Sequence, residues 1–292
     1  MSNEARPRAV LRTYPNWFYL PAALVFGVFF VVPTALAFYF SLTRWSLFDA
    51  TFIGLQNYAT FVQDPMLLSG LRNTIIYAVL TSGFKVIISL PLAMLLTSRI
   101  RAKTLLRGII FFPVLVSTIA VGITFSALMQ PSAGLINTVL GSLGLPQPDW
   151  LGNPSLALYS VAIVDVWRGV GLATVIFIAG ILSIPQDYFD VAKLEGGTWV
   201  KFRMVILPLS RNALFTVILL SFIGGLRSFD VIWAMTRGGP GFASDVLTSV
   251  IYKEYQAGFY GLSTAGNVVL FILVMIIVYP LIRLFNRLEI EL

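Results

Sequence analysis

The chain has 292 residues, of which 58% are hydrophobic and only 11% are charged, and its formal net charge is +7. A soluble domain usually carries about 25% charged residues, so this composition excludes an ordinary soluble protein. Cysteine and histidine are both absent, which excludes disulfides, thiolate nucleophiles and sites that depend on an imidazole base or metal ligand.

Six apolar runs are each long enough to cross about 30 Å of hydrocarbon. They predict six transmembrane helices over residues 18–42, 71–97, 105–129, 156–182, 209–235 and 262–284. Ala35-Leu36-Ala37 formally match a cleavage site, but the first run exceeds the ~7–15 apolar residues of a signal peptide. We therefore expect it to be retained, in an all-α membrane protein.

Basic residues gather in alternate connections between these runs. The basic positions are Arg6, Arg8, Arg12; Arg99, Arg101, Lys103, Arg107; Lys193, Lys201, Arg203, Arg211; and Arg283, Arg287. The positive-inside rule then predicts a cytoplasmic segment 1–17, one transmembrane domain over 18–287 with the connection 185–209 in the cytoplasm, and a cytoplasmic tail 288–292. This placement accounts for much of the positive charge without a nucleic-acid partner.

Charged residues inside the fourth run predict a polar pathway. Asp165 and Arg168 are three residues apart and share one helix face. A charge at the bilayer centre costs at least ~2.5–3.5 kcal/mol, so each should face protein or water. Trp167 offers an aromatic face and Gly169 a close approach to backbone, which favours a pathway over a local ion pair.

Three further charges lie within the apolar runs. Arg227 and Asp230 repeat the three-residue spacing near the outer end of the fifth run, where we expect a structural role. Lys85 lies mid-run in the second and is expected to pair with a carboxylate or to extend toward the membrane surface.

Small polar residues also lie mid-run. They are Ser117, Thr118, Ser221, Ser228 and Asn267. Most such side chains bond their own helix or a neighbour, although as a group they could bind a neutral, hydroxyl-rich solute. No phosphate-binding loop, metal-ligand spacing or nucleophile beside a base occurs in the sequence. Uphill transport would therefore draw energy from a partner or from an ion gradient.

The connection DVAKLEGGTWVKFRMVILPL, residues 190–209, is unusually ordered for a membrane-protein loop. It predicts a short helix over 190–195, a break at Gly196 and Gly197, a second amphipathic piece, and Pro208 opening the next span. Such a helix–turn–helix is either a docking surface for a soluble partner or an interfacial helix lying in the headgroups.

Residues 185–209 resemble the "EAA" loop of ABC-importer permeases. Asp190 stands where that family has Glu, Val191 and Ala192 where it has two alanines, and Gly196 at its glycine; Glu195 stands for a frequent Asp. The departures at Asp190, Val191 and Gly197 are conservative. The segment SFIGGLRSFDVIWAMTRGGPG, residues 221–241, is similar to that of carbohydrate importers in particular.

The resemblance implies a type I ABC-importer permease of the MetI-like fold, in the MalF-like subunit of a sugar importer. Such a chain is not itself an enzyme and resides in the plasma (inner) membrane of a bacterium or archaeon. It pairs with a second, homologous permease, two ATP-binding subunits that hold ATP and Mg²⁺, and an extracytoplasmic sugar-binding protein. The expected cargo is a disaccharide or short oligosaccharide. The alternatives are glycerol-3-phosphate or a similar phosphate ester, and an ion-coupled carrier.

The resemblance also assigns residues. Coupling to the ATPase falls on Asp190, Val191, Ala192, Glu195, Gly196, Gly197 and Pro208. Substrate contact about mid-membrane falls near Thr118, Asp165, Arg168, Gly169, Ser221, Gly225 and Ser228, where Asp165 would accept sugar hydroxyls while Trp167 stacks nearby. No cofactor or metal is expected in this chain.

Overall fold

The computed structural model describes residues 16–46, 48–98 and 100–288, and its regular structure is almost entirely helical. Four helical stretches are long and apolar enough to cross a membrane: Trp17–Phe40, Pro65–Thr97, Ala157–Leu182 and Tyr260–Arg287. Two sharply bent helix pairs bring the total to up to six when each pair counts as one span. The predicted all-α membrane fold is thereby confirmed. Of the basic residues behind the predicted orientation, Arg6, Arg8, Arg12 and Arg99 lie outside the described residues, as does the tail 289–292.

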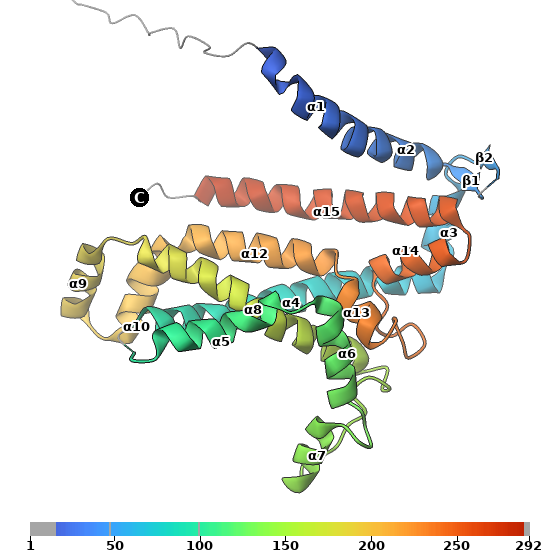
Figure 1. Cartoon of the computed structure of the whole chain (residues 1–292). Coiled ribbons are helices and arrows are strands. Elements are labelled where there is room, and N and C mark those ends of the chain that lie inside the picture. The colour runs from blue at the N-terminus through green and yellow to red at the C-terminus, as the bar shows by residue number, and fades with distance from the viewer. Residues whose placement is uncertain (1–15, 47, 99, 289–292) are drawn as a thin grey trace, which may run out of the picture.

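The N-terminal part of the first span diverges from the other helices, as Figure 1 shows, whereas its C-terminal part lies beside the last helix. Phe38 touches the last helix, with its ring centroid 5.9 Å from that of Phe271. None of the most apolar window of this span is buried, so its side chains require lipid or another chain around them. Its elements are η1 (Asn16–Tyr19), α1 (Leu20–Phe26), the π-helical segment η2 (Gly27–Val31) and α2 (Val32–Phe40).

A short hairpin and helix follow the first span. Strands β1 (Thr43–Trp45) and β2 (Ala50–Phe52) pair antiparallel, with Thr43 opposite Phe52, and α3 (Gln56–Gln63) follows. Asn57 of α3 donates from Nδ2 to the carbonyls of Ser41 and Thr43, at 2.8 Å each, which ties the hairpin to the bundle.

The long helix α4 (Pro65–Thr97) packs against both α8 (Ala157–Leu182) and α12 (Arg211–Leu226). It begins where the Asp64 carboxylate accepts the backbone N–H of Met66 at 2.7 Å, a helix N-cap. Glycines bring the helices close, as is usual where membrane helices meet. A Cβ on Gly225 of α12 would lie 2.6 Å from the Cα of Ala78 in α4.

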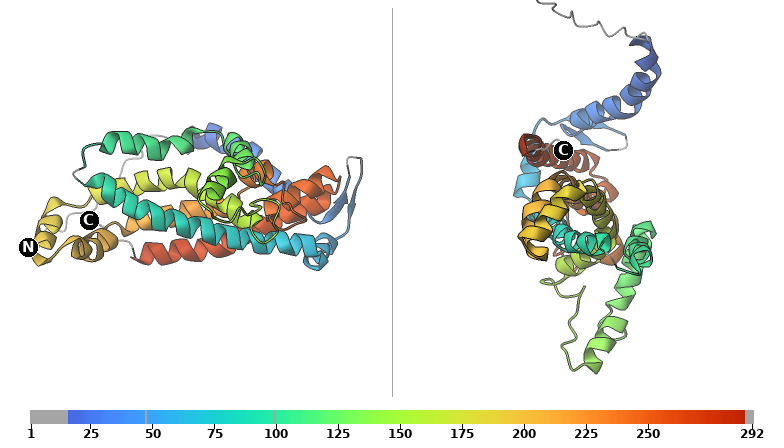
Figure 2. Two further views of the ribbon diagram at one scale, coloured as in Figure 1. Left: turned by 90° about the horizontal axis from the view of Figure 1, so that it is seen from below. Right: turned by 90° about the vertical axis from the view of Figure 1, so that its left-hand side faces the viewer.

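The third predicted span, 105–129, is a sharply bent pair of helices in the structure and not one continuous helix. α5 (Lys103–Leu115) and α6 (Thr118–Leu128) meet at 97°. Pro113 removes one backbone donor, and Val116 and Ser117 then adopt non-helical backbone angles. α6 therefore turns away from α5 and packs against α13 (Asp230–Met235), and the following α7 (Leu135–Ser142) projects from the bundle, as the right-hand view in Figure 2 shows.

The fifth predicted span is also interrupted, and Pro208 does not open it. Pro208 lies in the short turn α11 (Leu207–Leu209), and α12 begins at Arg211 after a 68° bend. Ser210, at the bend, has non-helical backbone angles and donates from Oγ to the Ile206 carbonyl at 2.5 Å. At the other end α12 stops at Leu226, and α13 (Asp230–Met235) is a separate helix.

The two ends of the bundle are different in character. One end carries α9 (Gln186–Glu195), the break at Gly196 and Gly197, α10 (Thr198–Val200) and the π-helical segment η3 (Lys201–Ile206). α9 thus contains the predicted helix 190–195 and begins four residues earlier. The opposite end carries α13, α14 (Leu247–Gln256) and the start of α15 (Tyr260–Leu288), as Figure 1 shows.

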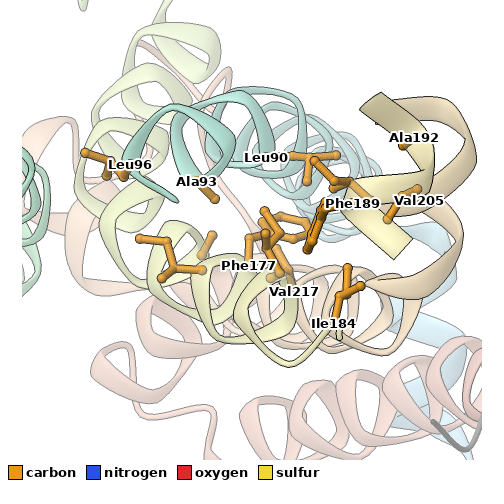
Figure 3. Packing of buried hydrophobic residues seen from close by; sticks show 13 residues of the cluster. Leu90, Ala93, Leu96, Phe177, Ile184, Phe189, Ala192, Val205 and Val217 are labelled. Carbon is orange, nitrogen blue, oxygen red and sulfur yellow. The ribbon is translucent and has the colours of Figure 1, made fainter. Parts of the chain in front are cut away.

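A hydrophobic cluster, here called the α9 core, joins α9 to the bundle (Figure 3). Phe189 and Ala192 of α9 are 9% and 4% exposed and pack with Phe177 of α8 and Leu90 of α4. Burying a side chain such as Phe189 contributes about 1.5–3 kcal/mol. The members are Leu90, Ala93, Leu96, Ala173, Phe177, Ile178, Ile181, Ile184, Phe189, Ala192, Val205, Ile206 and Val217.

Adjacent glycines of α12 provide a test of this packing. We expect Gly225→Ala to destabilise the fold by about 1–3 kcal/mol, because its new methyl would overlap the α4 backbone. Gly224→Ala is the matched control, since nothing lies within 4 Å of its Cβ position and the gain in helix propensity is the same. Thermal unfolding of the detergent-solubilised protein measures both, and equal midpoints would contradict the close α4–α12 contact.

Candidate functional site

A polar cavity of about 360 Å³ lies among α4, α8, α12 and the α5–α6 bend. Pockets of ~300–1,000 Å³ are typical of small-molecule sites. Six of the predicted pathway residues line this cavity together: Thr118, Asp165, Arg168, Gly169, Ser221 and Ser228. They come from three separate predicted spans, so the fold gathers side chains that lie more than a hundred residues apart.

Lys85 of α4 and Asp165 of α8 form a buried ion pair on the cavity wall. Their Nζ and Oδ2 atoms are 2.8 Å apart, and the two side chains are only 10% and 14% exposed. A Cβ on Gly169 would lie 2.4 Å from Cε of Lys85, so this glycine leaves the space that the lysine occupies. Of the two possibilities for Lys85, the structure shows pairing with a carboxylate, and its partner is the carboxylate that we expected to accept a sugar.

Three more charged side chains line the same cavity: Arg168, Arg227 and Asp230. Arg168 has a buried Nε with no hydrogen-bond partner within the part of the chain that the structure describes. We expected a structural role for Arg227 and Asp230, near the outer end of the fifth run. The structure places both on the cavity wall, because the chain leaves α12 at Arg227 and starts α13 at Asp230.

Trp167 and Gly225, also predicted for the pathway, lie elsewhere. Trp167 is 46% exposed, contacts Phe125 with ring centroids 5.1 Å apart, and lines a different, larger groove of about 670 Å³. That groove is almost wholly apolar, so it lacks the donors and acceptors that a hydroxyl-rich solute needs. Gly225 faces α4, and its neighbour Gly224 lines the cavity. Trp167 lies two residues from Asp165, about 200° around the helix, which explains its position. Gly225 is four residues from Ser221 and nearly on the same face, so only the packing of α12 on α4 removes it from the cavity.

Tyr77 is a residue that the sequence reasoning missed. It is completely buried in α4, and Asp165 and Ser228 are polar neighbours of its side chain. Its hydroxyl makes no hydrogen bond of normal geometry to any described residue. A tyrosine within an apolar run gave no signal beyond ordinary hydrophobicity, although buried tyrosines usually find a hydrogen-bond partner.

The coupling residues predicted in α9 divide between two faces. Ala192 belongs to the α9 core, whereas Val191 and Leu194 are 59% and 89% exposed. Asp190 is exposed, and its Oδ1 accepts a hydrogen bond from Lys193 Nζ at 2.6 Å. That bond, with a smaller contribution from Gln186, lowers the pKa of the Asp190 carboxyl, so this face keeps its negative charge.

Gly196 and Gly197 interrupt the helix after Glu195, but only at Gly196 does the turn leave no room for a side chain. A Cβ on Gly196 would lie 2.7 Å from Cγ2 of Val200, whereas nothing lies within 4 Å of the corresponding position on Gly197. The turn thus brings α10 back against the end of α9.

Comparison with known proteins identifies this arrangement. Residues 85–289 match the family model described as "Binding-protein-dependent transport system inner membrane component". The chain belongs to this family. It is thus a membrane-embedded permease component of an ABC transporter, and not the subunit that performs catalysis.

Relatives and solved structures agree with this assignment. The trehalose/maltose transport system permease protein MalF of Thermococcus litoralis is 32% identical over 273 residues, covering 92% of each chain. The diacetylchitobiose uptake system permease protein NgcF of Streptomyces coelicolor is 33% identical, covering 90% of this chain and 79% of the relative. A bacterial alginate ABC transporter, solved in complex with an alginate pentasaccharide-bound periplasmic protein, has a chain of the same fold with a TM-score of 0.79. Its sequence identity is 20%, and the match covers 92% of this chain and 93% of that one.

The Lys85–Asp165 pair provides a test of the cavity wall. We expect Lys85→Met and Asp165→Leu each to destabilise the permease by about 3–5 kcal/mol, because each leaves an uncompensated buried charge. The double variant Lys85→Met/Asp165→Leu should recover most of that loss. Thermal denaturation of the three variants in detergent measures this coupling, and additive losses in the double variant would show that the two side chains do not pair.

Proposed function

We propose that this permease forms half of the translocation pathway of an ATP-driven importer for a disaccharide or short oligosaccharide. The observation that carries the proposal is the mid-bundle cavity, in which Asp165 and Arg168 lie beside the hydroxyls of Thr118, Ser221 and Ser228. Carboxylate, guanidinium and hydroxyl groups together supply the acceptors and donors that sugar hydroxyls require. Two relatives named for their cargo, trehalose/maltose and diacetylchitobiose, are sugar permeases.

The proposed assembly follows from the exposed surfaces. A second, homologous permease completes the pathway, and membrane lipid surrounds the apolar first span. Two ATP-binding subunits hold ATP and Mg²⁺, and one of them docks at α9 through Asp190 and the exposed Val191 and Leu194. Both termini lie on that cytoplasmic side of a bacterial or archaeal plasma membrane, in keeping with the positive-inside rule. An extracytoplasmic sugar-binding protein delivers the cargo at the opposite end.

The mechanism uses the rigidity of the α9 core. Ala173 of α8 and Val217 of α12 belong to this cluster and also line the cavity. A displacement of α9 by the closing ATPase pair is therefore transmitted to two walls of the cavity through close-packed side chains, which deform little. In this model the permease rocks between inward-open and outward-open states around the sugar.

A phosphate ester is the second candidate cargo, and one observation favours it. The Asp165 carboxylate, which would repel a phosphate, is neutralised by Lys85 at 2.8 Å. Of the other charged residues that line the cavity, Arg168 and Arg227 are positive and only Asp230 is negative. Arginine is well suited to phosphate recognition. An ion-coupled carrier is a weaker alternative, because it gives α9 no role.

Substrate-stimulated ATP hydrolysis separates these candidates. The measurement uses the reconstituted complex of both permeases, the ATPase subunits and the binding protein, with a panel of glucosides, galactosides, chitobiose and glycerol-3-phosphate. We expect at least one di- or oligosaccharide to stimulate hydrolysis. Stimulation by the phosphate ester alone would replace the sugar by the second candidate, and solute accumulation by this chain without any ATPase would refute the proposal.

The turn after α9 provides a test of coupling. We expect Gly196→Leu to reduce sugar-stimulated ATP hydrolysis at least about tenfold, because the side chain would push α10 from α9 and misplace the docking face. Gly197→Ala is the matched control and should leave coupling near the original level, since its Cβ position is open. The amount of ATPase that co-purifies with each variant measures docking directly, and normal co-purification with full activity in Gly196→Leu would contradict this role.

A further inference from the structure

The segment 236–245, between α13 and α14, has an unusual backbone at the end of the bundle opposite α9 (Figure 1). Gly238 and Gly241 have φ angles of +87° and +59°. Arg237 has φ +51° and is the one non-glycine residue at positive φ among residues 16–46, 48–98 and 100–288. Such a conformation persists in a non-glycine residue only where the surroundings hold it, and it is concentrated at functional sites.

Asp245 is the residue that holds this segment from within. Its side chain is completely buried, and its two carboxylate oxygens accept from Ser249 Oγ at 2.8 Å and from Lys253 Nζ at 2.6 Å. A Cβ on Gly238 would lie within 1.8 Å of Oδ1 of Asp245, so the carboxylate fills the place of a side chain there. A buried carboxylate is stable only when paired and hydrogen-bonded in this way.

The segment is also anchored to the central helix of the bundle. Asn73 of α4 donates from Nδ2 to the carbonyls of Ala243 and Asp245, at 3.1 Å and 2.9 Å. Within the segment, the hydroxyls of Thr236 and Ser244 lie 2.7 Å apart. Asn73 thus fixes the C-terminal end of the segment on α4, and the Thr236–Ser244 bond ties the N-terminal end to it.

The outer surface of the held segment presents two large side chains. Arg237 is exposed, and Phe242 is 51% exposed, with Nζ of Lys253 located 5.7 Å from the centre of its ring. Arginine and aromatic residues are enriched at protein interfaces, and the arginine and the exposed ring here lie on a loop that loses little entropy on binding. The preceding helix α13 begins with Asp230 and Val231, which line the polar cavity.

We propose that residues 236–245 form a docking surface for the extracytoplasmic sugar-binding protein, and that Asp245 is the positioning residue that presents Arg237 and Phe242 to it. This inference rests on the proposed function. Three observations support it. The segment lies at the end of the bundle opposite the ATPase-docking helix, its backbone is fixed by buried hydrogen bonds, and it follows directly on a helix that lines the cavity. A partner with an acidic and an apolar patch fits a guanidinium beside an exposed ring.

Titration of the assembled transporter with sugar-loaded binding protein tests the proposal. We expect Asp245→Asn to raise the binding-protein concentration for half-maximal stimulation of ATP hydrolysis about tenfold, with basal and maximal rates nearly unchanged. Loss of a merely structural residue would instead lower the amount of active complex without moving this midpoint. Glu254→Gln is the matched control, a carboxylate-to-amide change beside Lys253 but outside the Asp245 network, and should leave the midpoint unchanged.

Two surface variants test the same proposal if Asp245→Asn folds poorly. Arg237→Ala and Phe242→Ala should each raise the same midpoint several-fold, because both remove exposed contact groups and leave the buried network in place. If the binding protein stimulates the wild-type complex and the midpoint is unchanged in both variants, this inference is wrong while the proposed function stands. Reduced recovery of the permease pair in the surface variants would also overturn it, by assigning the segment to the second permease. A wild-type complex that no sugar-loaded binding protein stimulates would refute the proposed function together with this inference.

Discussion

Close packing between α9 and the bundle is the constraint on which the rest of this structure depends. Phe189 and Ala192 turn inward from α9 and pack with side chains of α4, α8 and α12, while Val191 and Leu194 remain exposed. A helix held this way on one face cannot move without moving its support. Ala173 and Val217 belong to both the cluster and the cavity wall, which is why the proposed mechanism treats a push at α9 and a change in the cavity as one displacement.

The cavity combines charge and space in a way that suits transport. The ion pair between Lys85 of α4 and Asp165 of α8 neutralises two charges within membrane-spanning helices, where either charge alone would be costly. Gly169 leaves room for the lysine, and the α5–α6 bend brings Thr118 onto the wall. Hydroxyl, carboxylate and guanidinium groups thus reach a common space. Such a site can hold its cargo by hydrogen bonds that water replaces on release.

Much of this was accessible from sequence, and particular residues show where the reasoning stopped. The helical spacing of Asp165, Arg168 and Gly169 predicts one shared face, and the structure places all three on the cavity. The same spacing argument separates Trp167 from that face. It does not separate Gly225 from Ser221, four residues earlier, and the packing of Gly225 against α4 is a tertiary contact. A structural role was expected for Arg227 and Asp230 because both lie toward the outer end of the fifth apolar run. The break between α12 and α13 places them on the cavity wall, which no spacing within the run indicates.

The sequence by itself determined the membrane-spanning class, the helical turn that ends at Gly196, and the transporter family, because hydrophobic run length and local turn chemistry depend on neighbouring residues. Only the tertiary structure decided that Lys85 pairs with Asp165, that Tyr77 lies behind the cavity, and that Asp245 holds the segment 236–245. The pair joins residues 80 positions apart, and Asn73 reaches Asp245 across 172. Contacts at such separations are fixed by how helices pack and bend, which no local pattern encodes.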